Sequence, residues 1–397
     1  MKISYGKNVY GAEEINSVVS QLKKTTQMGA SVNKFEALIA KKFSKKYGLM
    51  VNSGSSALTL AMSVLGVNRN DEIIVPCLNF GTAISSIIQA GAKPILVDVE
   101  VDTLQIDVSE IEKKITNKTV AIMVPNLIGN IPDLKKIKII ATKHNLRVVE
   151  DSADTLGARI GNKTTGFYSD ISITSFYGSH IINCAGNGGA LAINNEKVME
   201  KAKLLRSWGR SSSLFDEKSE SIENRFNVDL DGIDYDAKFV FEKIGYNLEG
   251  NEVGAAFGLA QLEKLNTNIK IRRENFNRQC DFFSKYPNYF SNPEEIKGSQ
   301  TAWLAFPLLI KKNAPFKRKE MQIYLEKQNI QTRVVFTGNV MRQPMCNGIN
   351  FKAVDGGCPN ADEVMRSGIL LPVHHGLTEK MFNRFYSTID KFISEYC

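Results

Sequence analysis

Short apolar runs alternate with segments of helical periodicity over residues 10–245 of the chain. The runs "EIIVP" (72–76), "AIMVP" (121–125) and "RVVED" (147–151) lack the alternation of apolar and polar residues seen in half-exposed strands. Strands of this kind are buried on both faces, as in a parallel sheet between two layers of helices. The helical segments between the runs are long enough to connect parallel strands. The sequence therefore predicts an α/β fold around a mainly parallel sheet.

The pattern changes near residue 249. A long helical segment (251–286), read as one helix or two, is followed by strand, helix and strand patterns and by a terminal helix (379–396). A chain of 397 residues is too long for one simple core, so two domains are expected. We predict a large domain over residues 1–248 and a smaller α+β domain over residues 249–397.

The segment 211–243 interrupts the regular pattern of the large domain. It is polar and aromatic, with weak periodicity. A long irregular segment inside a compact domain is usually functional. We interpret it as a flap or a contact between subunits; the alternative is a plain surface excursion.

Composition narrows the class of protein. The net charge is +8, but the lysines lie in scattered groups without interleaved aromatic residues, which argues against a nucleic-acid groove. The chain has no apolar run of about 18 residues and no apolar stretch near its first residue, so we expect a cytoplasmic protein without a membrane span. None of the six cysteines forms a CxxC pair, so we expect free thiols and no metal site.

Four strand ends carry residues suited to chemistry. "NSGSSAL" (52–58) places Gly54, Ser55 and Ser56 at a predicted helix start, which suits either a phosphate or an ordinary serine N-cap. "VVEDSADTLGA" (148–158) ends a strand with Asp151 and Asp154, carboxylates at the ligand-binding edge of such a sheet or simple helix caps. At the third strand end Phe80 follows "EIIVPCLN", and at the fourth "SFYGSH" (175–180) contains Ser175 and His180. Phe80 could stack on a planar cofactor or belong to the core, and His180 could be a base or a structural histidine.

In this order the motifs resemble the DegT/DnrJ/EryC1/StrS sugar aminotransferase family of pyridoxal-phosphate enzymes. The resemblance extends over nearly the whole chain, including "PILVDVEVDTLQID" (94–107), "GYNLEGNEVGAAFGLAQLEKL" (245–265) and "LPVHHGLTEK" (371–380). It implies the aspartate-aminotransferase fold (fold type I), with a seven-stranded, mainly parallel sheet in the large domain. It also implies a homodimer with active sites at the subunit interface.

The resemblance assigns roles to individual residues. Gly54, Ser55, Ser56 and Ser175 would hold the cofactor phosphate, and Asp151 would pair with the pyridine nitrogen. The remaining cofactor contacts implied are Phe80 on the ring face, Asp154 near the 3-hydroxyl, and Asn247 at a phosphate across the dimer interface.

One position departs from the family pattern. Position 180 usually holds the lysine that forms the internal Schiff base, and here it is His180. This resembles the 3-dehydratase branch, in which pyridoxamine 5'-phosphate condenses with a nucleotide-linked 4-keto-6-deoxysugar, the histidine acts as base, and the C3 hydroxyl is expelled. L-Glutamate would regenerate the pyridoxamine form from pyridoxal 5'-phosphate. The loop "INCAGNGG" (182–189) also departs, with Asn187 where the family usually has a glutamate.

The branch contains iron–sulfur and cluster-free members. The cluster cysteines of the first kind are absent from "EDSADTLG" (150–157) and from the stretch after "WGR" (208–210), so we predict no cluster and favour a GDP-sugar over a CDP-sugar. Further predicted substrate contacts are Arg333 and Arg342, for a diphosphate or the glutamate carboxylate, and His374 and His375 at the edge of the cleft.

Three alternatives remain open at this point. The chain could be a sugar aminotransferase that uses a displaced lysine, with Lys163 the nearest candidate on the N-terminal side. It could be a dehydrase coupled to a reductase. It could also be a non-catalytic, cofactor-binding regulatory protein.

Overall fold

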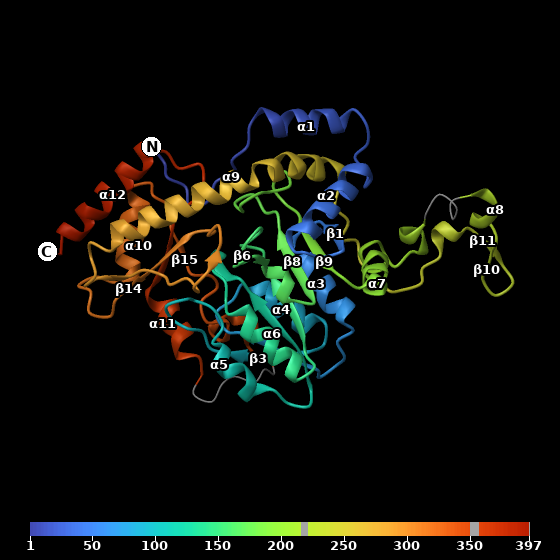
Figure 1. Cartoon of the computed structure of the whole chain (residues 1–397), viewed down its shortest axis with the longest axis horizontal. Coiled ribbons are helices and arrows are strands. Elements are labelled where there is room, and N and C mark those ends of the chain that lie inside the picture. The colour runs from blue at the N-terminus through green and yellow to red at the C-terminus, as the bar shows by residue number, and fades with distance from the viewer. Residues whose placement is uncertain (216–220, 350–356, 397) are drawn as a thin grey trace.

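A seven-stranded sheet forms the centre of the large domain in the computed structural model, which describes residues 1–215, 221–349 and 357–396 (Figure 1). The strand order is β1-β9-β8-β5-β4-β2-β3. Strand β9 is antiparallel to both neighbours, whereas the pairs from β8 to β3 are all parallel. The predicted α/β fold with a mainly parallel sheet is therefore confirmed. The strands are β1 (Tyr47–Val51), β2 (Glu72–Pro76), β3 (Lys93–Val97), β4 (Thr119–Pro125), β5 (Arg147–Asp151), β8 (Ile171–Ser175) and β9 (Gly189–Ile193).

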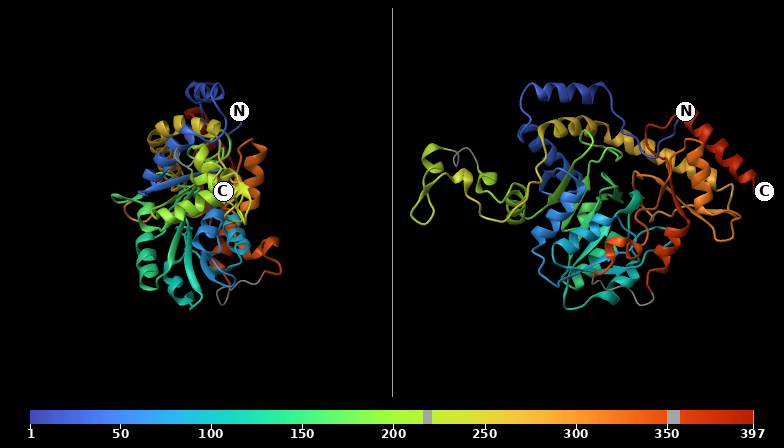
Figure 2. Two further views of the ribbon diagram at one scale, coloured as in Figure 1. Left: turned by 90° about the vertical axis from the view of Figure 1, so that its right-hand side faces the viewer. Right: turned by 180° about the vertical axis from the view of Figure 1, so that it is seen from behind.

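Helices cover both faces of this sheet (Figures 1 and 2). Successive residues of β4 point to opposite faces: Met123 packs in the same cluster as Ile84, whereas Ile122 packs in the cluster of Ile137. Each buried aliphatic side chain of this kind contributes about 1.5–3 kcal/mol to folding, which explains why the strands are apolar throughout. The helices of this domain are α1 (Ala12–Leu22), α2 (Ala30–Lys42), α3 (Gly54–Leu65), α4 (Gly81–Gln89), α5 (Val108–Ile111), α6 (Leu134–Lys143) and α7 (Glu196–Arg206).

One continuous helix, α9 (Glu252–Phe283), joins the large domain to the C-terminal part. Its first half packs on α1 and α2, and its second half carries Phe276, stacked on Trp303 with 4.3 Å between ring centroids. The C-terminal part is an α+β unit with a second sheet in the order β12-β14-β16-β15. Whether residue 248 marks the domain boundary stays a prediction. The elements are β12 (Phe290–Ser291), β14 (Phe306–Ile310), α10 (Arg318–Lys327), β15 (Arg333–Val334), α11 (Pro359–Ser367), β16 (Gly368–Leu371) and α12 (Glu379–Ser394).

A third, small sheet, in the order β13-β6-β7, ties the two parts together. Strand β13 (Ser299–Gln300) of the C-terminal part pairs with β6 (Arg159–Ile160), which forms a hairpin with β7 (Lys163–Thr164).

The segment between α7 and α9 projects from the body of the molecule (Figures 1 and 2). We refer to residues 208–248 as the arm. It carries α8 (Ile222–Arg225) and the strand pair β10 (Val228–Asp229) and β11 (Asp234–Tyr235). Several of its apolar side chains are exposed to solvent: Ile244 is 99% exposed and Ile222 is 74% exposed. The predicted flap or subunit contact over 211–243 coincides with the arm, except that 216–220 lie outside the described residues.

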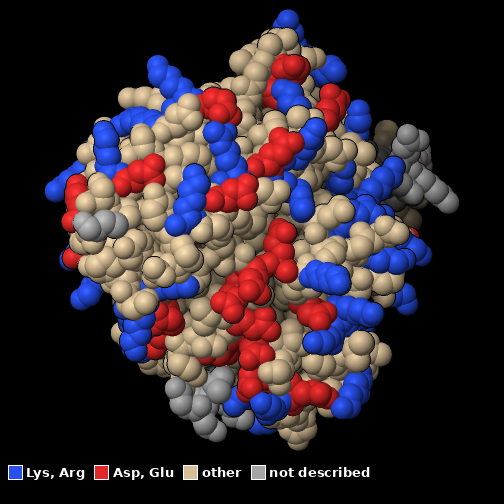
Figure 3. Space-filling model, turned by 60° about the vertical axis from the view of Figure 1, so that its left-hand side comes forward, with Lys and Arg blue, Asp and Glu red and all other residues tan. Residues whose placement is uncertain are grey.

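Basic and acidic side chains are interspersed on the surface shown in Figure 3, and a band of acidic side chains runs down its middle. No helix in the described residues combines the length and the apolar character needed to cross a membrane.

Candidate active site

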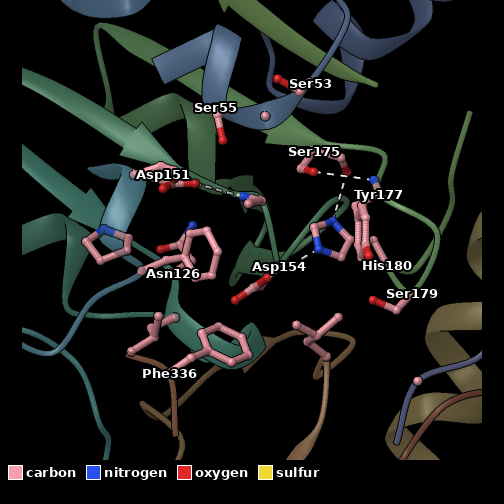
Figure 4. Close-up of a pocket in the computed structure, with 18 of the residues that line it drawn as sticks. Ser53, Ser55, Asn126, Asp151, Asp154, Ser175, Tyr177, Ser179, His180 and Phe336 are labelled. Carbon is pink, nitrogen blue, oxygen red and sulfur yellow. Dashed lines mark hydrogen bonds and ion pairs between the residues drawn. The ribbon is translucent and has the colours of Figure 1, made fainter. Parts of the chain in front are cut away.

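A cavity of about 670 Å³ lies at the carboxyl ends of the parallel strands (Figure 4). The turns after five strands supply most of its wall, because the carboxyl ends of parallel strands meet at one edge of a sheet. The C-terminal part and the first residues of the chain close the other side. The lining residues with polar or aromatic side chains include Tyr5, Ser55, Asn79, Phe80, Asn126, Asp151, Asp154, Ser175, Tyr177, His180, Asn187, Gln331, Arg333 and Phe336.

The start of α3 forms one end of the cavity. Ser53 caps the helix by accepting the backbone N–H of Ser56 at 3.1 Å, and the Ser55 side chain lies on the cavity wall with Ser175 (Figure 4). Position 54 has no room for a side chain, because a Cβ atom there would lie 2.7 Å from Cβ of Ser175. Free backbone N–H groups, two hydroxyls and the helix dipole together suit an anion.

Ser56 lies outside this set, although the sequence predicted it as a phosphate ligand. Its hydroxyl donates to Asn52 Oδ1 at 2.5 Å and lies 2.9 Å from Ser53 Oγ, and the residue does not line the cavity. The reason is helical geometry: the side chain at this position points back over the cap, away from the cavity.

Two carboxyl groups follow β5. Asp151 Oδ1 accepts the backbone N–H of Ala153 at 3.0 Å, and Asp154 Oδ2 accepts that of Ile128 at 2.9 Å. Burial raises the pKa of Asp151 to about 6 and that of Asp154 to about 7, with the charge of Asp151 adding to the shift at Asp154. A cationic nitrogen placed against Asp151 would return it to the carboxylate form.

His180 lies in the turn after β8 and faces the cavity (Figure 4). Its Nδ1 lies 3.2 Å from the carbonyl oxygen of Ser175. Because a carbonyl can only accept, Nδ1 carries the proton and Nε2 keeps its lone pair. Nε2 lies 3.9 Å from Asp154 Oδ1, and burial lowers the pKa of His180 to about 4. The imidazole is therefore neutral near pH 7, with an unprotonated nitrogen available as a base.

No lysine is among the described residues that line the cavity. Lys163 lies on β7 of the small third sheet, with Nζ 4.4 Å from the centre of the Phe167 ring. Its amine is thus engaged elsewhere.

Two further predicted residues lie on the wall. Phe80, the N-cap residue of α4, is half exposed and meets Phe336 edge to face at 5.8 Å between centroids. Arg333 reaches the cavity from β15, with its guanidinium 5.5 Å from the ring of Tyr5.

Three residues predicted to contact substrate do not line the cavity. His374 is buried and held by Ser4 O at Nε2 and by the N–H of Gly376 at Nδ1. His375 Nδ1 accepts from Arg272 Nε at 3.1 Å. Arg342 lies outside the cavity and pairs with Asp362. Their predicted contact with substrate stays a prediction. Within this chain the two histidines contact the N-terminal segment and α9, and Arg342 pairs with a nearby carboxylate.

Asn247 lies at the base of the arm, in an isolated bridge with Ser207, and is exposed. It does not line the cavity of its own chain. Its predicted role at the cavity of a second subunit stays a prediction.

Sequence reasoning missed part of the wall. Tyr5 and Gly6 come from the first residues of the chain, where no strand-end pattern points to a site. Asn126 follows β4, so the strand-end rule used for Asp151 could have found it.

Outside the cavity, Cys77, Asp98 and Cys358 bring groups that bind metals within 4.8 Å of one another. The Asp98 carboxylate already accepts the backbone N–H groups of Asn360 and Ala361 at the start of α11. Burial raises the pKa of the Cys77 thiol, whereas metals bind the thiolate. We therefore interpret this cluster as a link between the sheet and α11.

A helix start suited to an anion, a buried carboxyl pair and an imidazole base share one cavity on a mainly parallel sheet. These features define an enzyme of the α/β class with an aminotransferase-type fold. The sequence profile of the DegT/DnrJ/EryC1/StrS aminotransferase family matches residues 9–390, and the chain belongs to that family.

Three relatives illustrate the similarity. The dTDP-4-dehydro-2,6-dideoxy-D-glucose 3-dehydratase of Saccharopolyspora spinosa is 30% identical over 96% of this chain and 84% of its own length. A structure of E. coli GDP-4-keto-6-deoxy-D-mannose-3-dehydratase with bound hydrated PLP gives a TM-score of 0.88 at 26% identity, over 98% of this chain and all of that one. A structure of GDP-4-keto-6-deoxymannose-3-dehydratase with a trapped PLP-glutamate geminal diamine gives 0.87 at 26% identity, over 97% and 99%. These cofactor-bound relatives agree with the pyridoxal-phosphate cofactor predicted from the sequence.

Proposed function

We propose that the chain is a pyridoxamine-phosphate-dependent 3-dehydratase of a nucleotide-linked 4-keto-6-deoxysugar. The proposal depends on one observation: the neutral imidazole of His180 faces the cavity, and no lysine among the described residues lines that cavity. An enzyme without that lysine cannot recapture the cofactor aldehyde as an internal Schiff base. The cofactor can then rest as its amine.

The cavity fits this cofactor. Gly54, Ser55 and Ser175 would hold the phosphate at the start of α3, where a Cβ at residue 54 would fill the space. Asp151 would pair with the ring nitrogen, and Asp154 would lie near the 3-hydroxyl. Phe80 would stack on the ring. The bound cofactor supplies an amine that condenses with the sugar ketone and a conjugated ring that takes up electrons.

His180 would remove a proton at the reacting carbon beside the cofactor through Nε2. The hydrogen bond from Nδ1 to Ser175 O fixes the ring orientation for this step. In the net reaction, the sugar loses its C3 oxygen while L-glutamate is oxidised to 2-oxoglutarate and ammonia is released, so atoms and electrons balance.

Arg333 would contact the diphosphate of the substrate or the glutamate carboxylate, because its guanidinium reaches the cavity from the C-terminal part. We favour a GDP-sugar over a CDP-sugar, since the GDP-sugar dehydratases resemble this chain over nearly its whole length. The geminal diamine in one of those structures supports L-glutamate as amino donor.

A second copy of the chain would cover the arm. The arm exposes the large apolar side chains of Phe226, Ile233, Phe239 and Phe241, and such exposure is typical of an interface. Asn247 at the base of the arm would then reach the cofactor phosphate of the partner. This arrangement gives a homodimer with its active sites at the interface.

The family name makes an aminotransferase the second candidate function. That reaction needs a lysine at the cofactor, and Lys163 lies on the third sheet with its amine against Phe167. A reductase-coupled enzyme would need cluster cysteines, and these are absent from residues 150–157 and from the stretch after residues 208–210. A non-catalytic regulator would need no base in the cavity.

Replacing Gly54 with alanine tests the phosphate site. The new Cβ would lie 2.7 Å from Ser175 Cβ, so the start of α3 and Ser175 must move apart. The affinity for the cofactor should then fall by about 10-fold or more. Titration of the protein with pyridoxamine 5'-phosphate, followed by absorbance, measures the change. Gly11→Ala, at the N-cap of α1 outside the cavity, is the matched control. An unchanged affinity would contradict the assignment.

Incubation with L-glutamate and a panel of 4-keto-6-deoxy sugars linked to GDP, CDP and dTDP tests the function. We expect one panel member to lose one oxygen atom by mass spectrometry, with 2-oxoglutarate formed in equal amount. An amino sugar product would instead establish the aminotransferase. Cofactor binding without any turnover would establish the regulator, and iron in the purified protein would establish the reductase-coupled enzyme.

A further inference from the structure

The first residues of the chain are fastened to the C-terminal part. Ile3 exchanges backbone hydrogen bonds of 2.9 Å with Asn329 and Gln331. The N–H of Tyr5 donates to Gln331 Oε1 at 3.3 Å. His374, fully buried, donates from Nε2 to the carbonyl of Ser4 at 3.1 Å. These contacts fix the path of the backbone up to the cavity.

The same segment rests on the turn that carries His180. At Gly6 a Cβ atom would lie 2.8 Å from Cβ of Ser179, so the two backbones approach closely. Two residues later, Asn8 Oδ1 accepts from Asn183 Nδ2 at 2.7 Å. Tyr5 is therefore held between the turn of the proposed base and the C-terminal part.

Tyr5 lines the cavity together with His180 and Asp154, and its ring lies under the guanidinium of Arg333. Its Oη atom is buried and has no hydrogen-bond partner among the described residues. A buried hydroxyl without a hydrogen-bond partner reduces the stability of the fold by about 1–3 kcal/mol. Such a group is therefore expected to gain a partner when substrate is bound.

The surroundings of Tyr5 favour the sugar as that partner. In the proposed function the start of α3 binds the cofactor phosphate and Asp151 pairs with the ring nitrogen, and both lie on other parts of the cavity wall. Tyr5 lines the same cavity as the base and lies beside Arg333, the residue suited to the diphosphate that is linked to the sugar. Burial raises the pKa of Tyr5, so the phenol stays protonated and donates a hydrogen bond without transferring its proton. A neutral donor suits a hydroxyl better than a carboxylate, for which the cavity offers Arg333.

We propose that Tyr5 Oη donates a hydrogen bond to the C3 oxygen of the bound sugar and orients it for departure. This inference rests on the proposed function. The C3–O bond breaks with its electron pair on oxygen, and the oxygen takes one proton, which His180 holds after its own step, and leaves as water. Tyr5 retains its proton throughout and stabilises the developing charge on the oxygen.

Tyr5→Phe removes only the hydroxyl and tests the proposal. We expect kcat/KM for sugar dehydration to fall by about 10- to 100-fold. Conversion of bound pyridoxal phosphate to pyridoxamine phosphate by L-glutamate, followed by absorbance, should stay within about twofold, because that half-reaction involves no sugar. Tyr10→Phe is the matched control: its exposed ring lies on the same segment, against Phe257 and outside the cavity.

Binding of unreactive sugar nucleotides gives a second readout. In these probes a C4 hydroxyl replaces the ketone, and one probe has the C3 hydroxyl while the other lacks it. The wild-type protein should bind the first more tightly by about 10-fold, and Tyr5→Phe should bind both alike. A variant with full activity and unchanged discrimination overturns the role of Tyr5 alone. A wild-type enzyme that dehydrates no panel member overturns the proposed function and, with it, this assignment.

Discussion

His180→Asn should reduce sugar dehydration by about 10²- to 10⁴-fold, the loss expected when a general base is removed. The asparagine amide can still donate to Ser175 O, the hydrogen bond that holds the imidazole at 3.2 Å. The turn after β8 therefore keeps its contact, and the lost group is the unprotonated nitrogen. Single-turnover incubation of the pyridoxamine-phosphate-loaded enzyme with the sugar nucleotide, followed by mass spectrometry, measures the rate.

His144→Asn is the control for this change. His144 lies at the end of α6, where Nε2 is 2.8 Å from Glu112 on the surface, far from the cavity wall. Its replacement should leave the rate within about twofold. If His180→Asn matched the wild type, another group would have to be the base.

The pH dependence of kcat/KM also tests whether the neutral imidazole of His180 is the base. Burial is the main cause that lowers the pKa of His180 to about 4, and the nearby charge of Arg272 lowers it further. Protonation of the imidazole removes the base, and through this group alone the rate falls only where the pH drops toward that lowered value. The neighbouring Asp154 has a pKa raised to about 7, so the measurement is made in Asp154→Asn, in which this carboxyl no longer titrates. Between about pH 7.5 and 5.5 kcat/KM of this variant should change little, whereas a histidine with an unperturbed pKa of about 6.5 would lose about tenfold. A drop of that size near pH 6.5 would show that the imidazole is not shielded in the working enzyme.

The part of the site on strand ends was predictable from the sequence. Apolar runs locate the strands, and the parallel order brings the residues after β1, β2, β5 and β8 to one edge. Asp151, Phe80 and His180 are therefore found together because each lies at the end of a buried strand or in the turn that follows it. The identity of residue 180 separates the proposed dehydratase from an aminotransferase.

The remaining wall depends on contacts between distant parts of the chain. Tyr5 enters the cavity because Ile3 pairs beside Ile330, more than three hundred residues away, and no local pattern encodes that pairing. His374 and His375 look like ligands in "LPVHHG", yet Nε2 of His374 donates to a backbone carbonyl and Nδ1 of His375 accepts from Arg272. Whether a polar side chain near a strand end faces the ligand or fastens the scaffold is decided by such partners, which a single sequence does not reveal.

Asp151→Asn should reduce dehydration by about 10²-fold or more, and it should also weaken cofactor binding. Asparagine keeps an oxygen that can accept the N–H of Ala153, now at 3.0 Å from Oδ1, so the turn after β5 is preserved. It cannot carry the negative charge that holds a proton on the ring nitrogen, and an unprotonated ring is a poorer acceptor of electrons. The half-reaction with L-glutamate depends on the same electron acceptor, so it should slow in parallel, unlike in Tyr5→Phe.

A parallel loss in both half-reactions would distinguish Asp151 from His180 and Tyr5. In the proposed arrangement Asp151 would act on the cofactor and affect both half-reactions, whereas His180 and Tyr5 would face the reacting sugar. Asp154→Asn is a matched comparison, because its Oδ2 accepts the N–H of Ile128 and the residue would lie near the 3-hydroxyl of the proposed cofactor, away from the ring nitrogen. We expect the smaller loss for Asp154→Asn. Equal rates in Asp151→Asn and the wild type would mean that the ring nitrogen is protonated by another group, and the orientation proposed for the cofactor would have to be reversed.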